Sequence, residues 1–88
     1  MRTRLKRPEK EQGKHLHHIY FGRANRKQSE KWGCVIYLSP EEHNMSNKGV
    51  HFNREFDLYL KSECQKRLEG AGWTRAEFIE TFGRNYLD

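Results

Sequence analysis

The stretch HLHH, residues 15–18, holds three of the chain's five histidines: His15, His17 and His18. The other two, His43 and His51, come later in the chain. Imidazole titrates near neutral pH and serves both as a metal ligand and as a general base, so a histidine cluster is typical of metal-dependent hydrolysis. Adjacent residues of a strand point to opposite faces, and His17 and His18 could not both bind one cation without distortion. The pattern therefore predicts different roles for the two residues, unless they are simply the polar residues of a strand.

Positive charge is concentrated in the first part of the chain. The net charge is +5, and residues 1–32 carry ten Lys and Arg against three Asp and Glu. This imbalance is typical of a polyanion-binding protein, because each phosphate that is neutralised releases condensed counterions. Residues 1–13 are expected to form a flexible basic tail, which either binds nucleic acid or only increases solubility. Five further polar residues follow the histidine stretch: Arg23, Asn25, Arg26, Lys27 and Lys31. They either position a phosphate near the histidines or belong to a solvated loop.

Cysteine usage and hydropathy limit the class of protein. Cys34 and Cys64 do not form a CxxC motif, which excludes a zinc finger built from cysteines, and we expect both to be reduced, buried thiols. No apolar run approaches the roughly 20 residues that cross a bilayer, and the first residues lack the apolar region of a secretory signal. We therefore expect a cytoplasmic protein with no membrane partner.

Hydrophobic periodicity predicts an α+β domain over residues 14–88. Residues 15–21 and 34–39 are rich in aromatic and β-branched residues and indicate two strands of a hairpin, joined by a polar loop over residues 22–33. Apolar residues at helical spacing predict a long helix that begins near residue 50 and ends near Gly70. Thr74 and Glu77 form a capping-box motif for a short second helix that ends at Gly83, and the last five residues are expected to fold back onto it.

Three segments, HHIYFGRANRKQSEKWG, LSPEEHNMSNKGVHFNREFDLYLK and FGRNYL, resemble small phage and prophage HNH-endonuclease-like proteins, which are related to phage recombination-enhancement nucleases. The resemblance implies a ββα-metal fold, a hairpin plus a helix, that cuts DNA with one divalent cation. It makes His18 the general base and His17, His43 and His51 the metal ligands, with Asn53 steadying the metal or the base. Histidine ligands favour zinc, nickel or manganese, whereas magnesium prefers oxygen.

The chain departs from these relatives in its cysteines. Many of them carry a CxxC before the paired histidines, and this chain has none. We therefore expect no structural zinc and a hairpin held instead by Tyr20, Phe21, Trp32 and Tyr37. The expected function is that of a metal-dependent DNA endonuclease of phage or prophage origin, acting in the host cytoplasm. The alternative is a degenerate HNH-like module that binds nucleic acid or inhibits a host or phage protein.

Overall fold

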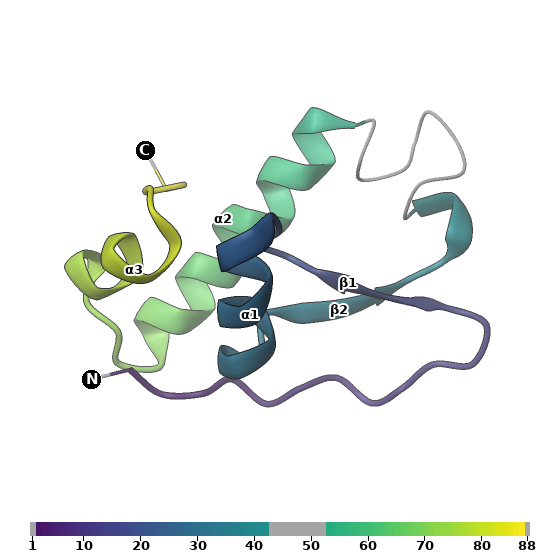
Figure 1. Cartoon of the computed structure of the whole chain (residues 1–88), viewed down its shortest axis with the longest axis horizontal. Helices are drawn as coiled ribbons and strands as arrows, with labels where there is room; N and C mark the ends of the chain where they lie inside the picture. Colours follow the sequence, from purple (N-terminus) through teal and green to yellow (C-terminus); the bar gives the residue numbers. More distant parts are fainter. Residues whose placement is uncertain (1, 43–52, 88) are drawn as a thin grey trace.

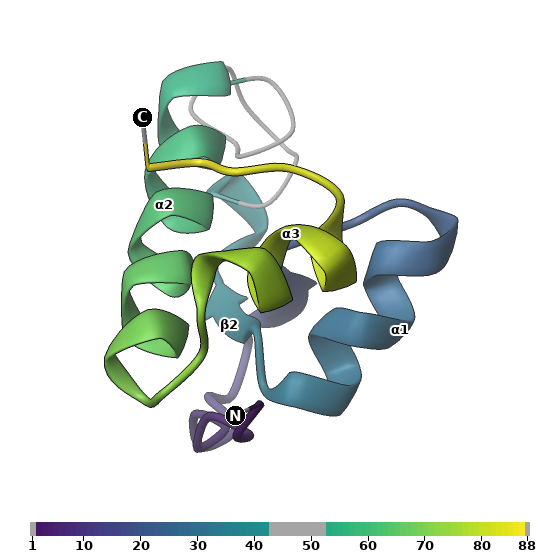
Figure 2. The ribbon, with the colours of Figure 1, turned by 90° about the vertical axis from the view of Figure 1, so that its left-hand side faces the viewer.

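The computed structural model describes residues 2–42 and 53–87 of the 88-residue chain. Within them lie a two-stranded antiparallel sheet and three helices, which confirms the predicted α+β class. The elements follow in the order β1 (His15–His18), α1 (Arg23–Trp32), β2 (Val35–Leu38), α2 (Arg54–Gly70) and α3 (Arg75–Phe82). In Figure 1 the sheet extends to the right of α1, and Figure 2 shows α3 lying across the space between α1 and α2. The more specific ββα-metal arrangement stays a prediction.

The two predicted strands pair with each other, but both are shorter than expected. His15 lies opposite Leu38 and His18 lies opposite Val35 in the antiparallel register. Beyond the last pair, the backbone N–H of Ile19 still donates to the carbonyl of Cys34 at 2.9 Å. The histidine stretch therefore forms β1 itself, and its position is fixed by the ladder with β2.

The predicted loop between the strands is wrong, because residues 23–32 form helix α1. Apart from Trp32, which packs against the core, the buried side of α1 is polar, and its polar groups have partners. The Ser29 hydroxyl donates to the Tyr20 carbonyl at 2.7 Å and accepts from the Tyr20 N–H at 3.0 Å. The Trp32 indole N–H donates to Gln28 at 3.0 Å. Apart from Trp32, this inner face carries no large apolar side chain, and for that reason the pattern of apolar residues did not indicate a helix.

Helices α2 and α3 begin and end at the local signals found in the sequence. Asn53 caps α2, with its side-chain oxygen accepting from the N–H of Phe56 at 3.0 Å, and the helix ends at Gly70 as predicted. The capping box of Thr74 and Glu77 is present at the start of α3, which ends before Gly83. The expected beginning of the long helix, near residue 50, lies outside the described residues.

An aromatic cluster forms the core. The Tyr20 ring lies 4.3 Å from that of Phe82 and 5.4 Å from that of Phe78, centroid to centroid. Trp32 and Trp73 meet edge to face at 5.1 Å. Tyr20 and Trp32 thus pack as expected. The other two aromatic residues lie outside the core: Phe21 is 41% exposed and contacts the ring of His17 on β1, and Tyr37 is not part of the core cluster.

Two smaller predictions are confirmed. Cys34 and Cys64 are free thiols, and both are buried. The last described residues fold back onto α3, where the Tyr86 ring lies 6.2 Å from that of Phe78. They also contact α2: the buried amide of Gln65 donates to Asn85 at 2.7 Å and accepts from the N–H of Tyr86 at 2.8 Å. A buried glutamine with both ends of its amide bonded fixes the direction in which the chain leaves α3.

The N-terminal segment runs along the domain before it enters β1 (Figure 1). The Trp73 indole donates to the Thr3 carbonyl at 2.8 Å, and the N–H of Leu5 donates to the Trp32 carbonyl at 2.9 Å. A Cβ on Gly33 would lie 2.3 Å from the Leu5 carbonyl oxygen, so only glycine lets the segment approach the end of α1 so closely. The proposed boundary between a 1–13 tail and a 14–88 domain stays a prediction, but residues 3 and 5 have defined contacts.

Candidate functional site

The adjacent histidines of β1 lie on opposite faces of the sheet, as strand alternation requires. His17 is 2% exposed, lies opposite Ile36, and has its ring 6.0 Å from that of Phe21. The His18 side chain is 15% exposed and faces α1, where it meets Glu30. The two imidazoles therefore have different surroundings, and His18 is the one that faces a charged surface.

His18 belongs to a chain of three side chains from three segments. Its Nε2 lies 2.6 Å from Oε2 of Glu30, and Nη1 of Arg7 lies 2.8 Å from Oε1 of the same carboxylate. The hydrogen bond from His18, and secondly that from Arg7, hold the pKa of Glu30 below its ordinary value. Glu30 is thus an ionised acceptor at neutral pH, and a neutral His18 must donate to it through Nε2–H. Its Nδ1 is then the nitrogen that can accept a proton.

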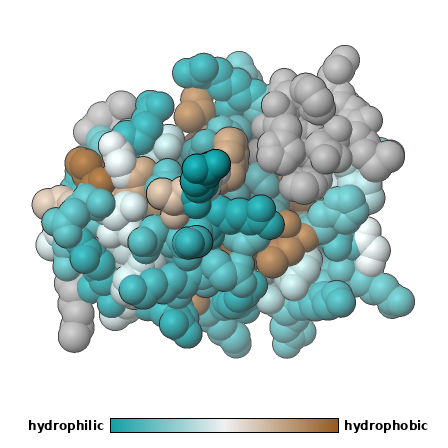
Figure 3. Space-filling view, viewed as in Figure 1, coloured by the Kyte–Doolittle hydropathy of each residue, from teal (hydrophilic) through white to brown (hydrophobic). Residues whose placement is uncertain are grey.

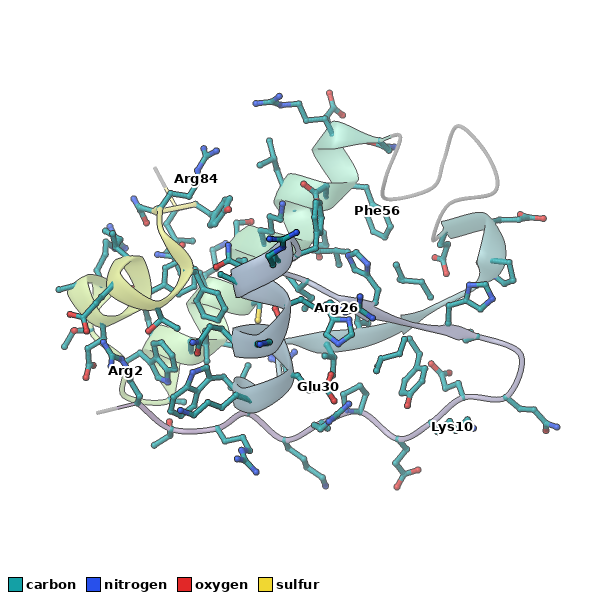
Figure 4. The ribbon with its side chains drawn as sticks, in the orientation of Figure 1. Arg2, Lys10, Arg26, Glu30, Phe56 and Arg84 are labelled. Carbon is teal, nitrogen blue, oxygen red and sulfur yellow. The ribbon has the colours of Figure 1, made fainter. Side chains whose placement is uncertain are left out.

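Basic side chains lie along one face of α1, beside His18 and Glu30. Five charged residues lie on one side of the helix, at positions i, i+3, i+4, i+7 and i+8: Arg23, Arg26, Lys27, Glu30 and Lys31. With His18 they line a surface hollow of about 620 Å³. Figure 4 shows Arg26 and Glu30 on this helix, and the surface seen from the same direction is mostly hydrophilic (Figure 3). We call Arg23, Arg26, Lys27 and Lys31 the α1 cations.

A second hollow continues the first toward β1. It measures about 380 Å³ and is lined by Leu16, His17, His18, Phe21, Gly22, Arg23 and Arg26. His18, Arg23 and Arg26 are common to both hollows. The first turn of α1 contains no acidic residue and begins with Arg23, although the N-terminal end of a helix disfavours cations. This excess of positive charge suits an anionic ligand.

Two of the candidate residues have structural partners instead. The Asn25 amide donates to the Phe82 carbonyl at 3.2 Å and so joins α1 to the end of α3, away from the α1 cations. The side-chain oxygen of Asn53 is engaged in capping α2. The site that the described residues build therefore contains neither amide.

The candidate metal ligands are only partly placed. His43 and His51 lie outside the described residues, and His17 is the remaining member of the set. Within residues 2–42 and 53–87, no three His, Cys, Asp or Glu side chains come together as a metal-binding group. The part of the donor set that can be described is thus one buried imidazole on β1.

Sequence reasoning missed Arg7 and Glu30. Glu30 could have been found from the charged residues at helical spacing between residues 23 and 31, once that segment was considered as a helix. Arg7 had no such signal, because its position depends on the course of the N-terminal segment.

Comparison with known proteins gives no family: no family model, curated protein or solved structure matches the chain. None of the described helices is long and apolar enough to cross a membrane.

Proposed function

We propose that this chain is a metal-dependent DNA endonuclease of the HNH type in which His18 is the general base. The observation that carries the proposal is the position of His18, whose imidazole lines the same hollow as the α1 cations. A DNA phosphate bound there lies beside a nitrogen that can accept a proton. Arginine and lysine side chains suit this task because they bind phosphate oxygens without reading the bases.

The residues of this chain have separate tasks in the proposed reaction. The α1 cations hold the phosphodiester next to β1. His18 takes a proton through Nδ1 from the water that attacks phosphorus, since its Nε2 is occupied by Glu30. General-base catalysis of this kind contributes about 10²–10⁴-fold in rate.

A divalent cation completes the proposed site. When bound, it would stabilise the negative charge that develops on the leaving oxygen. His17, His43 and His51 are the candidate ligands, and Mg²⁺, Mn²⁺, Ni²⁺ and Zn²⁺ the candidate ions. The burial of His17 at the sheet suits a ligand, because a buried imidazole is held in one orientation.

Plasmid cleavage tests this function. Supercoiled plasmid is incubated with the protein and each of the four cations in turn, and we expect nicked plasmid that disappears when a chelator is added. His15→Ala is the control, since His15 is an exposed residue outside the proposed site and its loss should leave nicking unchanged.

Binding without cleavage is the second candidate function. The α1 cations need neither a metal nor a base to hold phosphate, and they form the larger part of the described site. DNA binding with no nicked product under any of the four cations would favour this candidate and contradict the first.

A further inference from the structure

The N-terminal segment reaches the His18 site through Arg7. Leu5 is held by its hydrogen bond to the last residue of α1, and Gly33 leaves room for it there. Two residues later, Arg7 reaches back along α1 to Glu30, which lies about half a turn before Trp32. The fixed backbone at residue 5 thus limits where the guanidinium of Arg7 can lie.

Each oxygen of the Glu30 carboxylate has its own partner. Arg7 donates to Oε1 from the N-terminal segment, and His18 meets Oε2 from β1. A surface ion pair of two mobile side chains contributes little by itself, but a carboxylate with a partner on each oxygen loses its freedom to rotate. Arg7 therefore orients the oxygen that His18 meets.

We propose that Arg7 and Glu30 are positioning residues: the N-terminal segment fixes the Glu30 carboxylate, and the carboxylate holds neutral His18 in the tautomer with hydrogen on Nε2. The use of Nδ1 as the proton acceptor rests on the proposed function. The tautomer itself does not, because it follows from the two hydrogen bonds. Among the described residues, the charged side chains that line the hollow with His18 and Glu30 are the α1 cations, which offer no acceptor to compete with Glu30.

Ring-nitrogen NMR tests the tautomer directly. In ¹⁵N-labelled protein, at a pH at which the His18 ring carries a single proton, long-range ¹H–¹⁵N spectra separate a protonated from an unprotonated ring nitrogen. For His18 we expect a protonated Nε2 and an unprotonated Nδ1. Arg7→Ala and Glu30→Ala should move both shifts toward the average of two tautomers, whereas Arg7→Lys should move them less.

Arg4→Ala is the matched control, because it removes the same charge from the same segment at an exposed position. Amide spectra of all variants confirm that the fold is retained. An Nδ1–H tautomer in the unaltered protein would overturn the proposal. His18 shifts that are the same in Arg7→Ala, Glu30→Ala and Arg4→Ala would also overturn it.

A second measurement separates this inference from the proposed function. If the protein nicks plasmid, Arg7→Ala should lower the cleavage rate at saturating DNA by about 10-fold, a part of what a general base contributes, and Arg4→Ala should leave it unchanged. An equal effect of both variants would assign Arg7 to charge alone. If no plasmid is nicked, the proposed function fails, while the NMR result still decides whether Arg7 and Glu30 position His18.

Discussion

Removing two α1 cations should change the salt dependence of DNA binding by a defined amount. Arg23→Gln combined with Lys27→Gln takes two positive charges from the face of α1 that lines the hollow. From residue 23 to residue 31 the helix rises about 12 Å, at about 1.5 Å per residue. A duplex carries about seven phosphates over that length, one per about 1.7 Å with both strands counted. The phosphates over that length thus outnumber the four α1 cations.

The expected magnitude follows from counterion release. Each phosphate contact contributes about −0.9 to the slope of log K against log salt. The loss of two contacts should therefore make the slope less negative by about 1.8. Raising the salt concentration from 50 to 200 mM should therefore weaken binding by about 150-fold for a protein that makes four such contacts and by about 12-fold for one that makes two. Contacts elsewhere in the chain add the same amount to both proteins and do not alter the difference.

Fluorescence anisotropy with a labelled 20-bp duplex measures these constants at several salt concentrations. The control is Lys66→Gln with Arg75→Gln, which removes one lysine and one arginine from exposed positions on α2 and α3. It should keep the slope of the unaltered protein. Equal slopes for the two double variants would refute the assignment of phosphate binding to α1.

Three further outcomes are expected. Thr74→Ala, which removes the N-cap of α3, should lower the free energy of unfolding by about 1 kcal/mol in urea denaturation, and an unchanged midpoint would contradict the role of the cap. The pKa of Glu30 is lowered in the folded state, so the ionised carboxylate stabilises the fold above about pH 4.3, and this stabilisation is lost as the pH falls further. Between pH 6 and pH 3, Glu30→Gln should therefore lose less stability than the unaltered protein. Added Mn²⁺ or Zn²⁺ should raise the melting temperature, since a ligand that binds only the native state stabilises it. His17→Ala should remove this increase and His15→Ala should retain it. The same increase in both variants would exclude His17 as a ligand.

Elements with local signals were predictable from sequence. The capping box places the start of α3, Gly70 marks the end of α2, and Pro40 follows the second strand closely. Each signal lies within a few residues of the boundary that it determines, and its physical cause is a backbone hydrogen bond or a restricted dihedral angle. Such features do not depend on distant parts of the chain.

Helix α1 was not predictable in this way because its inner face depends on distant partners. Ser29 bonds to the backbone of Tyr20, and Asn25 to that of Phe82. Neither contact leaves a trace in hydrophobic periodicity, so the segment has the composition of a polar loop. Most of the residues that line the hollow around His18 were named from the sequence, but their arrangement on one helical face was not predicted.

The course of the N-terminal segment was also beyond sequence reasoning. The stretch has few apolar residues, and a basic composition favours disorder. Two hydrogen bonds nevertheless fix it: the backbone N–H of Leu5 donates to the Trp32 carbonyl, and the Trp73 indole donates to the Thr3 carbonyl. The link from Arg7 to His18 follows from those two contacts, and no local pattern encodes it.

His18 is the residue on which the proposed activity depends. Its cleavage role is tested by comparing the unaltered protein with His18→Ala on labelled duplex at saturating protein, in the presence of the cation that supports nicking. We expect the variant to bind DNA with the same affinity and to cleave at least about 100-fold more slowly, because the base is lost while the α1 cations remain. Cleavage by His18→Ala at the rate of the unaltered protein would contradict the assignment of the base and, with it, the proposed mechanism.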